Sequence, residues 1–302
     1  MADQLKSLIT PELLDLVVDT IIPFSKSEPL DFAKIRREFG TPLDGWPQGV
    51  TEKLWPVLVA LSKIDLSSTT DMTTFLPAPS DASFPHKALG LQMLIDQMPR
   101  RLCRGIHSRW TNMHFDVISL RLAEWLLTLP PDQQPHTWAR WKDTVTLDYW
   151  VIARQWFGAP FVHDDTAASQ ERAIAFTDET RRQVEQATGT TDPHRAERRA
   201  ILSDIYAFPR IIRGDNVLED PTVQGYTYWM CMLMDVHKPI VDRFGHYPYR
   251  NAYAGRQDTP DEEDWFRETD DFARPSKEDR EKLAKDIAAG VWTPLPPVLG
   301  SK

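Results

Sequence analysis

The 302-residue chain has few of the residues that cross-link a fold or anchor it in a bilayer. Its two cysteines, Cys103 and Cys231, cannot form a disulfide framework and lack the spacing of a zinc site, so we interpret them as buried thiols. No stretch approaches the roughly 18 apolar residues that span a membrane, and the N-terminus has no apolar signal core. We therefore expect a cytoplasmic protein that does not bind membranes.

The sequence also lacks a basic excess and a phosphate-binding loop. Lys+Arg 35 against Asp+Glu 44 gives a net charge of −9, which argues against a nucleic-acid partner. Neither a glycine-rich phosphate loop nor a dinucleotide fingerprint is present, so we predict no organic cofactor. With 41% apolar and 26% charged residues, the composition is that of an ordinary globular protein.

Aromatic residues, by contrast, are abundant. The chain has 11 Trp, 13 Phe and 7 Tyr, which is more than core filling requires. Four of the tryptophans lie between Trp138 and Trp156, shortly before His163. This concentration predicts an aromatic-walled pocket for a small molecule. Core packing is the alternative explanation for each of these tryptophans.

Apolar residues recur at helical spacing along most of the chain, and no segment alternates as a half-buried strand would. The pattern predicts an all-α protein, a helical bundle of about eight to eleven helices. We expect one domain over residues 1–302, with an extended tail over 291–302. The main helices are expected at 87–104, 112–129, 138–157 (ending at Gly158), 167–186, 226–244 (bent at Pro239) and 276–289.

The first polar segment that could carry chemistry is Asp96-Gln97-Met98-Pro99-Arg100, which is followed by Arg104. On a helix, Arg100 and Arg104 are i, i+4 neighbours. Guanidinium groups at this spacing can clamp a carboxylate or a phosphate. The alternative is that Asp96 pairs with an arginine and only fixes the packing of helices.

The second segment is His163-Asp164-Asp165, directly before an expected helix. A histidine beside carboxylates can act as a general base, and the three residues could also hold a metal ion. The simpler alternative is that an aspartate here is the N-cap of the helix.

The third segment begins at His237, on the apolar stripe of its helix. A lone histidine there is more often a satisfied core group than a ligand. However, a dense polar and aromatic loop follows, and loops held by rigid helices are where binding groups concentrate. The loop contains Tyr247, Tyr249, Arg250, Asn251 and Arg256.

Taken in order, these segments resemble the widespread family known as domain of unknown function 924. Members carry Asp-Gln-x-Pro-Arg-Asn and then Arg-Gly, which residues 96–101 and 104–105 match, except that Arg101 replaces the asparagine. Members then carry Met-Pro-Phe-x-His-Ser-Glu at a helix start. Residues 159–165 are similar, with Asp165 in the glutamate position.

The third family block is a histidine, then Phe-Gly-Arg-Phe-Pro-His-Arg-Asn, Leu-Gly-Arg and Thr-x-Glu-Glu. It is matched by His237, 244–251, 254–256 and 259–263. This chain departs from the family where His246 replaces an arginine and Tyr249 replaces a histidine. Both changes make the expected pocket less cationic and more aromatic.

The resemblance covers about residues 88–266. It implies an all-helical fold with tetratricopeptide-like helix hairpins, and it supplies no settled reaction. It also implies that the matching polar residues line one pocket between helices. We assign His163, Asp165 and His237 as candidate catalytic residues. The candidate substrate-binding residues are Asp96, Arg100, Arg104, Tyr247, Tyr249, Arg250, Asn251 and Arg256.

Our leading hypothesis is a small-molecule enzyme of the lyase or isomerase type. A His/Asp pair would move protons while Arg100 and Arg250 hold an anionic or enolic oxygen of a hydrophobic substrate. Dehydration, isomerisation or cyclisation would suit such a site. One alternative is a non-catalytic helical-repeat module for a peptide or protein partner. A second is a hydrolase with a divalent metal at His163, Asp165 and His237. The sequence is compatible with a homo-oligomer.

Overall fold

The computed structural model describes residues 2–37, 46, 49–67, 71–215 and 217–300. Within these ranges it contains helices and connections but no strand, so the predicted all-α fold is confirmed. The α-helices are α1 (Ala2–Leu8), α2 (Pro11–Ile21), α3 (Phe32–Arg37), α4 (Val50–Leu61), α5 (Phe84–Leu102), α6 (Ser108–Trp110), α7 (Asp116–Thr128), α8 (Leu147–His163), α9 (Ala167–Thr188), α10 (Arg198–Ile201), α11 (Ala207–Arg213), α12 (Val223–Asp235), α13 (Lys238–Phe244), α14 (Asn251–Ala254), α15 (Pro260–Glu268) and α16 (Lys277–Ala288).

The helices of the described residues are somewhat more numerous than the expected eight to eleven. The additional ones are short: α6 has three residues, and α10 and α14 have four each. Over residues 291–300 the chain forms neither helix nor strand.

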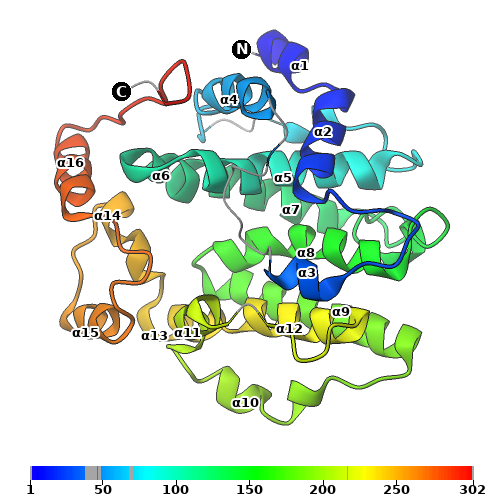
Figure 1. Cartoon of the computed structure of the whole chain (residues 1–302). Coiled ribbons are helices and arrows are strands. Elements are labelled where there is room, and N and C mark those ends of the chain that lie inside the picture. Colours follow the sequence, from blue (N-terminus) through cyan, green and yellow to red (C-terminus); the bar gives the residue numbers. More distant parts are fainter. Residues whose placement is uncertain (1, 38–45, 47–48, 68–70, 216, 301–302) are drawn as a thin grey trace.

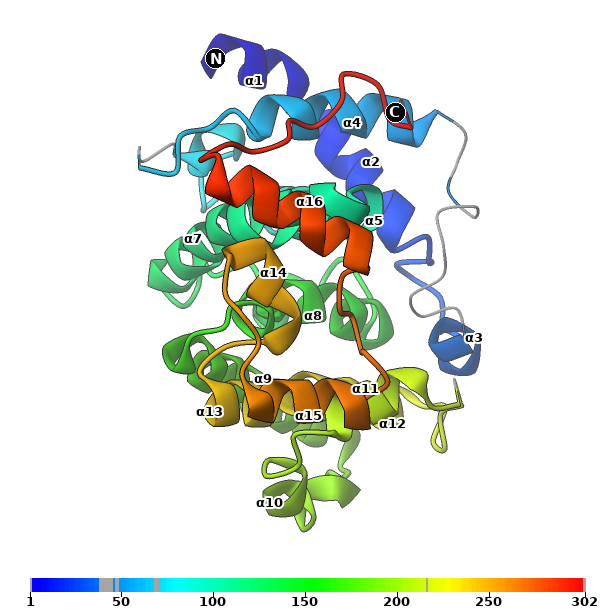
Figure 2. The ribbon, with the colours of Figure 1, turned by 90° about the vertical axis from the view of Figure 1, so that its left-hand side faces the viewer.

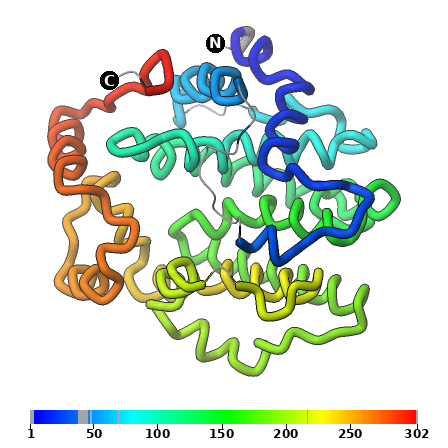
Figure 3. The backbone as a smooth tube through the Cα atoms, in the orientation of Figure 1, coloured from blue at the N-terminus to red at the C-terminus, as the bar shows by residue number. Residues whose placement is uncertain are grey.

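The long helices form a stack in which consecutive members pack on one another (Figure 1). α2 lies on α5, α5 contacts α7 and α8, and α8 contacts α9 and α12. α9 and α12 pack together at the end of the stack that is farthest from α1 (Figure 3). The C-terminal helices α14, α15 and α16 run along one side of the stack (Figure 2). The candidate site lies where this C-terminal column meets the stack.

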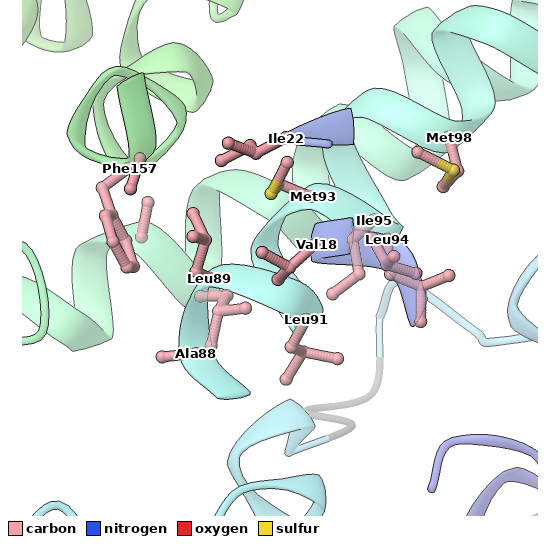
Figure 4. Packing of buried hydrophobic residues seen from close by; sticks show 14 of the residues in the cluster. Val18, Ile22, Ala88, Leu89, Leu91, Met93, Leu94, Ile95, Met98 and Phe157 are labelled. Carbon is pink, nitrogen blue, oxygen red and sulfur yellow. The ribbon is translucent and has the colours of Figure 1, made fainter. Parts of the chain in front are cut away.

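Close approach of α2 and α5 builds much of the core. Val18 and Ile22, from α2 and its C-terminal end, lie near apolar side chains of α5 (Figure 4). The backbones come close at Gly90, where a Cβ atom would lie 2.4 Å from the backbone oxygen of Leu14. A side chain at this position would therefore force the two helices apart.

Hydroxyl residues begin several helices where the sequence indicates. Thr10, Thr166 and Ser276 each accept a hydrogen bond from a backbone N–H in the first turn of α2, α9 and α16. Thr166, rather than Asp165, is the N-cap of α9. Gly189 ends that helix with φ 70°, a left-handed conformation that favours glycine.

For the helix expected over 138–157, both the predicted start and the predicted end are wrong. Residues 138–140 form a separate turn of 3-10 helix, and α8 begins after its N-cap Thr146. α8 then continues through Gly158 to His163 instead of ending at the glycine. A Cβ atom at Gly158 would lie 2.6 Å from Phe176 of α9 and 2.8 Å from Met234 of α12. The glycine serves close helix packing, so it is not a helix end.

The single bent helix expected over 226–244 is also wrong, because the structure has two helices, α12 and α13. Pro239 lies in the first turn of α13, where a missing N–H costs nothing. In a continuous helix, residue 239 would have to donate its N–H to the carbonyl of Asp235, and proline has no N–H. The break places His237 at the junction of the two helices.

Candidate functional site

Asp96 and His163 form a hydrogen-bonded pair. Asp96 lies on the buried side of α5 and is 1% exposed, whereas the side chain of His163, at the end of α8, is 23% exposed. His163 Nδ1 lies 2.9 Å from Asp96 Oδ1. Burial raises the pKa of Asp96, but the charges of His163 and Arg100 and two hydrogen bonds outweigh burial and lower this pKa to about 2. Asp96 is therefore an ionised acceptor at neutral pH, and Nδ1 is the donor.

The pair belongs to a closed polar cluster, here named the His163 ring, which consists of Asp96, Arg100, Asp116, Arg250 and His163. Arg100 Nη2 lies 3.8 Å from Asp96 Oδ1 and donates a hydrogen bond to Asp116 Oδ1. Arg250 Nη2 donates to Asp116 Oδ2 and to the backbone oxygen of His163. The ring thus joins α5, α7, the end of α8 and the 3-10 turn Pro248–Arg250.

Two members of this arrangement escaped the sequence analysis. Asp116, the first residue of α7, is 6% exposed and links the two arginines. Ser119 is fully buried and donates a hydrogen bond of 3.2 Å to Asp96 Oδ1. Their spacing of i, i+3 puts both on the buried side of α7, whose other buried residues are apolar, and this spacing is the signal that the sequence offers.

His237 lies beside the ring and is buried. Its Nδ1 donates to the backbone oxygen of Leu233 at 2.9 Å, and its ring centroid is 3.7 Å from that of Phe208 in α11. Burial lowers its pKa to about 3, helped by the charges of His163 and Arg100 and opposed by backbone hydrogen bonds. His237 is therefore neutral at pH 7, with an acceptor lone pair on Nε2.

Tyr247 and Tyr249 stack with ring centroids 5.1 Å apart and an interplanar angle of 11°. The Tyr247 hydroxyl is fully bonded, since it donates to the backbone oxygen of Val162 and accepts from Gln170 Nε2. The Tyr249 hydroxyl has no hydrogen bond within the described part of the chain. Burial raises the pKa of Tyr249, so its hydroxyl stays protonated. Tyr247 therefore holds the loop to α8, and Tyr249 keeps an unused donor.

Asn251, Arg256 and Asp165 form a neighbouring network. Arg256 Nη2 lies 3.5 Å from Asp165 Oδ2, and Arg256 Nε donates to Asn251 Oδ1 at 2.9 Å. Asn251 in turn donates to Asp258 and to the buried Glu262 at the start of α15. None of these bonds involves the side chain of His163. The network fixes the C-terminal column and touches the site only at its edge.

Arg104 does not join the His163 ring. It donates to the backbone oxygens of Arg100 and Cys103 at the end of α5, where a cation is favourable. Of the tryptophans before His163, Trp141 and Trp150 lie in the main core, where they donate to the backbone oxygens of Pro135 and His136. The rings of Phe208 and Tyr247 pack on His237, and Tyr249 stacks on Tyr247.

The residues that the structure describes contain no group of three or more His, Cys, Asp or Glu side chains placed to hold a metal ion. A cavity of about 360 Å³ lies between α2 and the segment before α5, and its lining includes Lys6, Leu14 and Phe75 but no residue of the His163 ring. Every helix within the described ranges is too short or too polar to cross a bilayer.

These features define an all-helical protein with a buried ring of aspartates, arginines and one histidine. The chain belongs to the family described as bacterial protein of unknown function (DUF924), whose model matches residues 68–270. The matched range contains every member of the ring, and the resemblance inferred from the three motifs is confirmed. No curated protein and no solved structure matches the chain.

Proposed function

We propose that the protein is a small-molecule enzyme in which His163 is the general acid/base. The observation that carries the proposal is the Asp96–His163 pair. A buried, ionised carboxylate accepts the hydrogen bond from Nδ1, which leaves Nε2 as the ring nitrogen that can exchange a proton with a substrate. Nε2 has no partner among the described residues, and the side chain is partly exposed. The same pairing orients the histidine base of hydrolytic triads.

The chemistry that this arrangement supports is proton transfer on an organic substrate. His163 takes a proton at Nε2 and returns it to another atom, which suffices for isomerisation, and the same acid/base pair serves dehydration or cyclisation. His237 has too low a pKa to hold a proton at pH 7, so we assign it to accepting a hydrogen bond from the substrate. Arg100 and Arg250 stabilise a developing oxyanion.

The test compares wild-type protein with His163→Gln in a protein-free extract of cellular metabolites. Mass spectrometry follows which compounds are consumed and formed. We expect the wild type to convert a compound into a product of equal mass, or of a mass lower by one water. His163→Gln should slow this conversion by about 10²–10⁴-fold, the range for loss of a general acid/base.

Two further variants sharpen the result. Asp96→Asn should also slow the reaction, because an amide can hold the imidazole in the wrong tautomer. His194→Gln, which changes a histidine outside the ring, should leave the rate unchanged. Thermal melts of all variants show which remain folded. A folded His163→Gln protein with wild-type turnover would refute the proposal.

A non-catalytic binding module is the second candidate. The observation in its favour is that Asn251 and Arg256 bond the start of α15 and Asp165 rather than the His163 side chain, as structural pins would. In that case no metabolite is converted. A peptide or protein partner would then bind wild type and folded His163→Gln equally well.

A further inference from the structure

Both arginines of the His163 ring retain unused donors. Arg250 is 5% exposed and Arg100 partly buried, yet every hydrogen bond that either side chain makes passes through its Nη2 atom. The Nε atom of each is buried and has no hydrogen-bond partner among the residues that the structure describes. Leaving a buried N–H of a charged group without an acceptor is costly, and native structures rarely do so without a reason.

Tyr249 adds a third unused donor to the same region. Its ring is stacked on Tyr247, and Arg250 lies over the Tyr247 ring with its guanidinium carbon 5.6 Å from the centroid. The charges of Arg250 and Arg100 both act on the Tyr249 hydroxyl, which places it in the field of the two guanidinium groups. All three donors thus belong to the His163 ring or to the residue that directly precedes Arg250.

The two carboxylates of the His163 ring are already engaged by other donors. Asp116 accepts from both arginines, and Asp96 accepts from His163, Gln97 and Ser119. The group that would complete the site is therefore an acceptor without protons. A carboxylate has this chemistry, and it matches the planar geometry of guanidinium donors.

We propose that Arg100, Arg250 and Tyr249 bind the carboxylate of a small organic acid. The inference rests on the proposed function in one respect: it makes this acid the substrate whose reacting atom meets His163 Nε2. Phe208 on His237 and the stacked tyrosines give the rest of the molecule flat, apolar walls. The substrate class is thus a carboxylic acid with a compact apolar body.

The first experiment measures protection of His163. Diethyl pyrocarbonate modifies accessible neutral imidazoles, and mass spectrometry of the His163 peptide gives the rate. The probes are acetate, succinate and benzoate, each compared with its neutral amide. We expect at least one carboxylate to slow modification several-fold and to raise the melting temperature, whereas its amide does neither. Carboxylates and amides with equal effects, or with none in both assays, would overturn the inference.

Tyr249→Phe tests the donor while keeping the stacked ring. The variant should weaken carboxylate binding by about tenfold, the usual loss for a hydrogen bond to a charged group. Tyr206→Phe, at an exposed tyrosine of the same chain, should change nothing. Unchanged binding by Tyr249→Phe would remove Tyr249 from the site. Inorganic phosphate is tested in the same protection assay. If phosphate protects His163 and no carboxylate does, the site binds phosphate and the carboxylate proposal is wrong.

The two proposals can fail separately. If His163-dependent turnover is found but no carboxylate protects His163, the acid/base function stands and the carboxylate site is wrong. If carboxylates protect His163 in a manner that requires Tyr249, but no metabolite is converted, the site stands as a binding site and the enzymatic function is wrong.

Discussion

The low pKa of His237 predicts that this residue makes the protein less stable as the pH falls from 7 to 5. In the folded protein His237 is buried, and burial together with the charges of His163 and Arg100 lowers its pKa to about 3. In the unfolded chain a histidine has a pKa of about 6.5. Between these values the unfolded state binds a proton that the folded state does not.

The sign and size of the effect follow from proton linkage. The contribution of His237 to stability is fully present above pH 6.5 and is lost as the pH falls toward 3. Well below pH 6.5 the slope approaches about 1.4 kcal/mol per pH unit, so the loss between pH 7 and 5 is about 2 kcal/mol. Asp96 titrates in a lower window, between about 4 when unfolded and about 2 when folded, and does not contribute here.

Urea unfolding monitored by tryptophan fluorescence at pH 7, 6 and 5 measures this loss. His136, whose pKa burial also lowers to about 3, contributes with the same sign. Burial also lowers the pKa values of His86, His107 and His114, so the wild type should lose more than the about 4 kcal/mol that His136 and His237 account for together. His237→Gln should lose about 2 kcal/mol less than the wild type. His194→Gln is the matched control and should follow the wild type. Identical pH dependence in the wild type and His237→Gln would refute the reasoning.

Further predictions concern packing, the ring and the thiols. Gly158→Ala should reduce the free energy of unfolding by about 1–3 kcal/mol, because the new methyl group meets side chains of α9 and α12. Asp116→Asn should lower the free energy of unfolding by about 3–5 kcal/mol, because two arginines lose their shared carboxylate. Arg104→Ala, at the exposed end of α5, should change the free energy of unfolding by less than about 1 kcal/mol. Urea unfolding measures this free energy for all three variants. Burial raises the pKa of Cys103 and Cys231 to about 12, so iodoacetamide should label both only in urea.

Local sequence patterns were sufficient for the helices but not for their limits. Thr10, Thr166 and Ser276 act as caps because a cap needs only residues within one turn. The local pattern at Gly158 predicts a helix end, because the two side chains that require a glycine there, on α9 and α12, are distant in the sequence. A glycine that ends a helix and one that permits close packing look the same in a local pattern.

The sequence was sufficient to predict most of the residues that form the candidate site, but not which of them bond to one another. His163, Asp96, Arg100 and Arg250 are brought together, as the family motifs implied. Asp116 went unnoticed because its role depends on Arg250, 134 positions away. Trp141 and Trp150 show the opposite case, because both are close to His163 in sequence but bond to backbone oxygens of the main core.

The closure of the His163 ring through a backbone oxygen also affects how the protein folds. Arg250 contacts positions 134 and 87 residues earlier in the chain, so the last bonds of the ring close large loops. Closing such loops is entropically costly and occurs after the local helices form. Until residue 250 docks, Asp116 and the end of α8 have no common partner. The complete ring, with Arg250 in place beside His163, should therefore form late in refolding, in the same step that joins the C-terminal column to the helical stack.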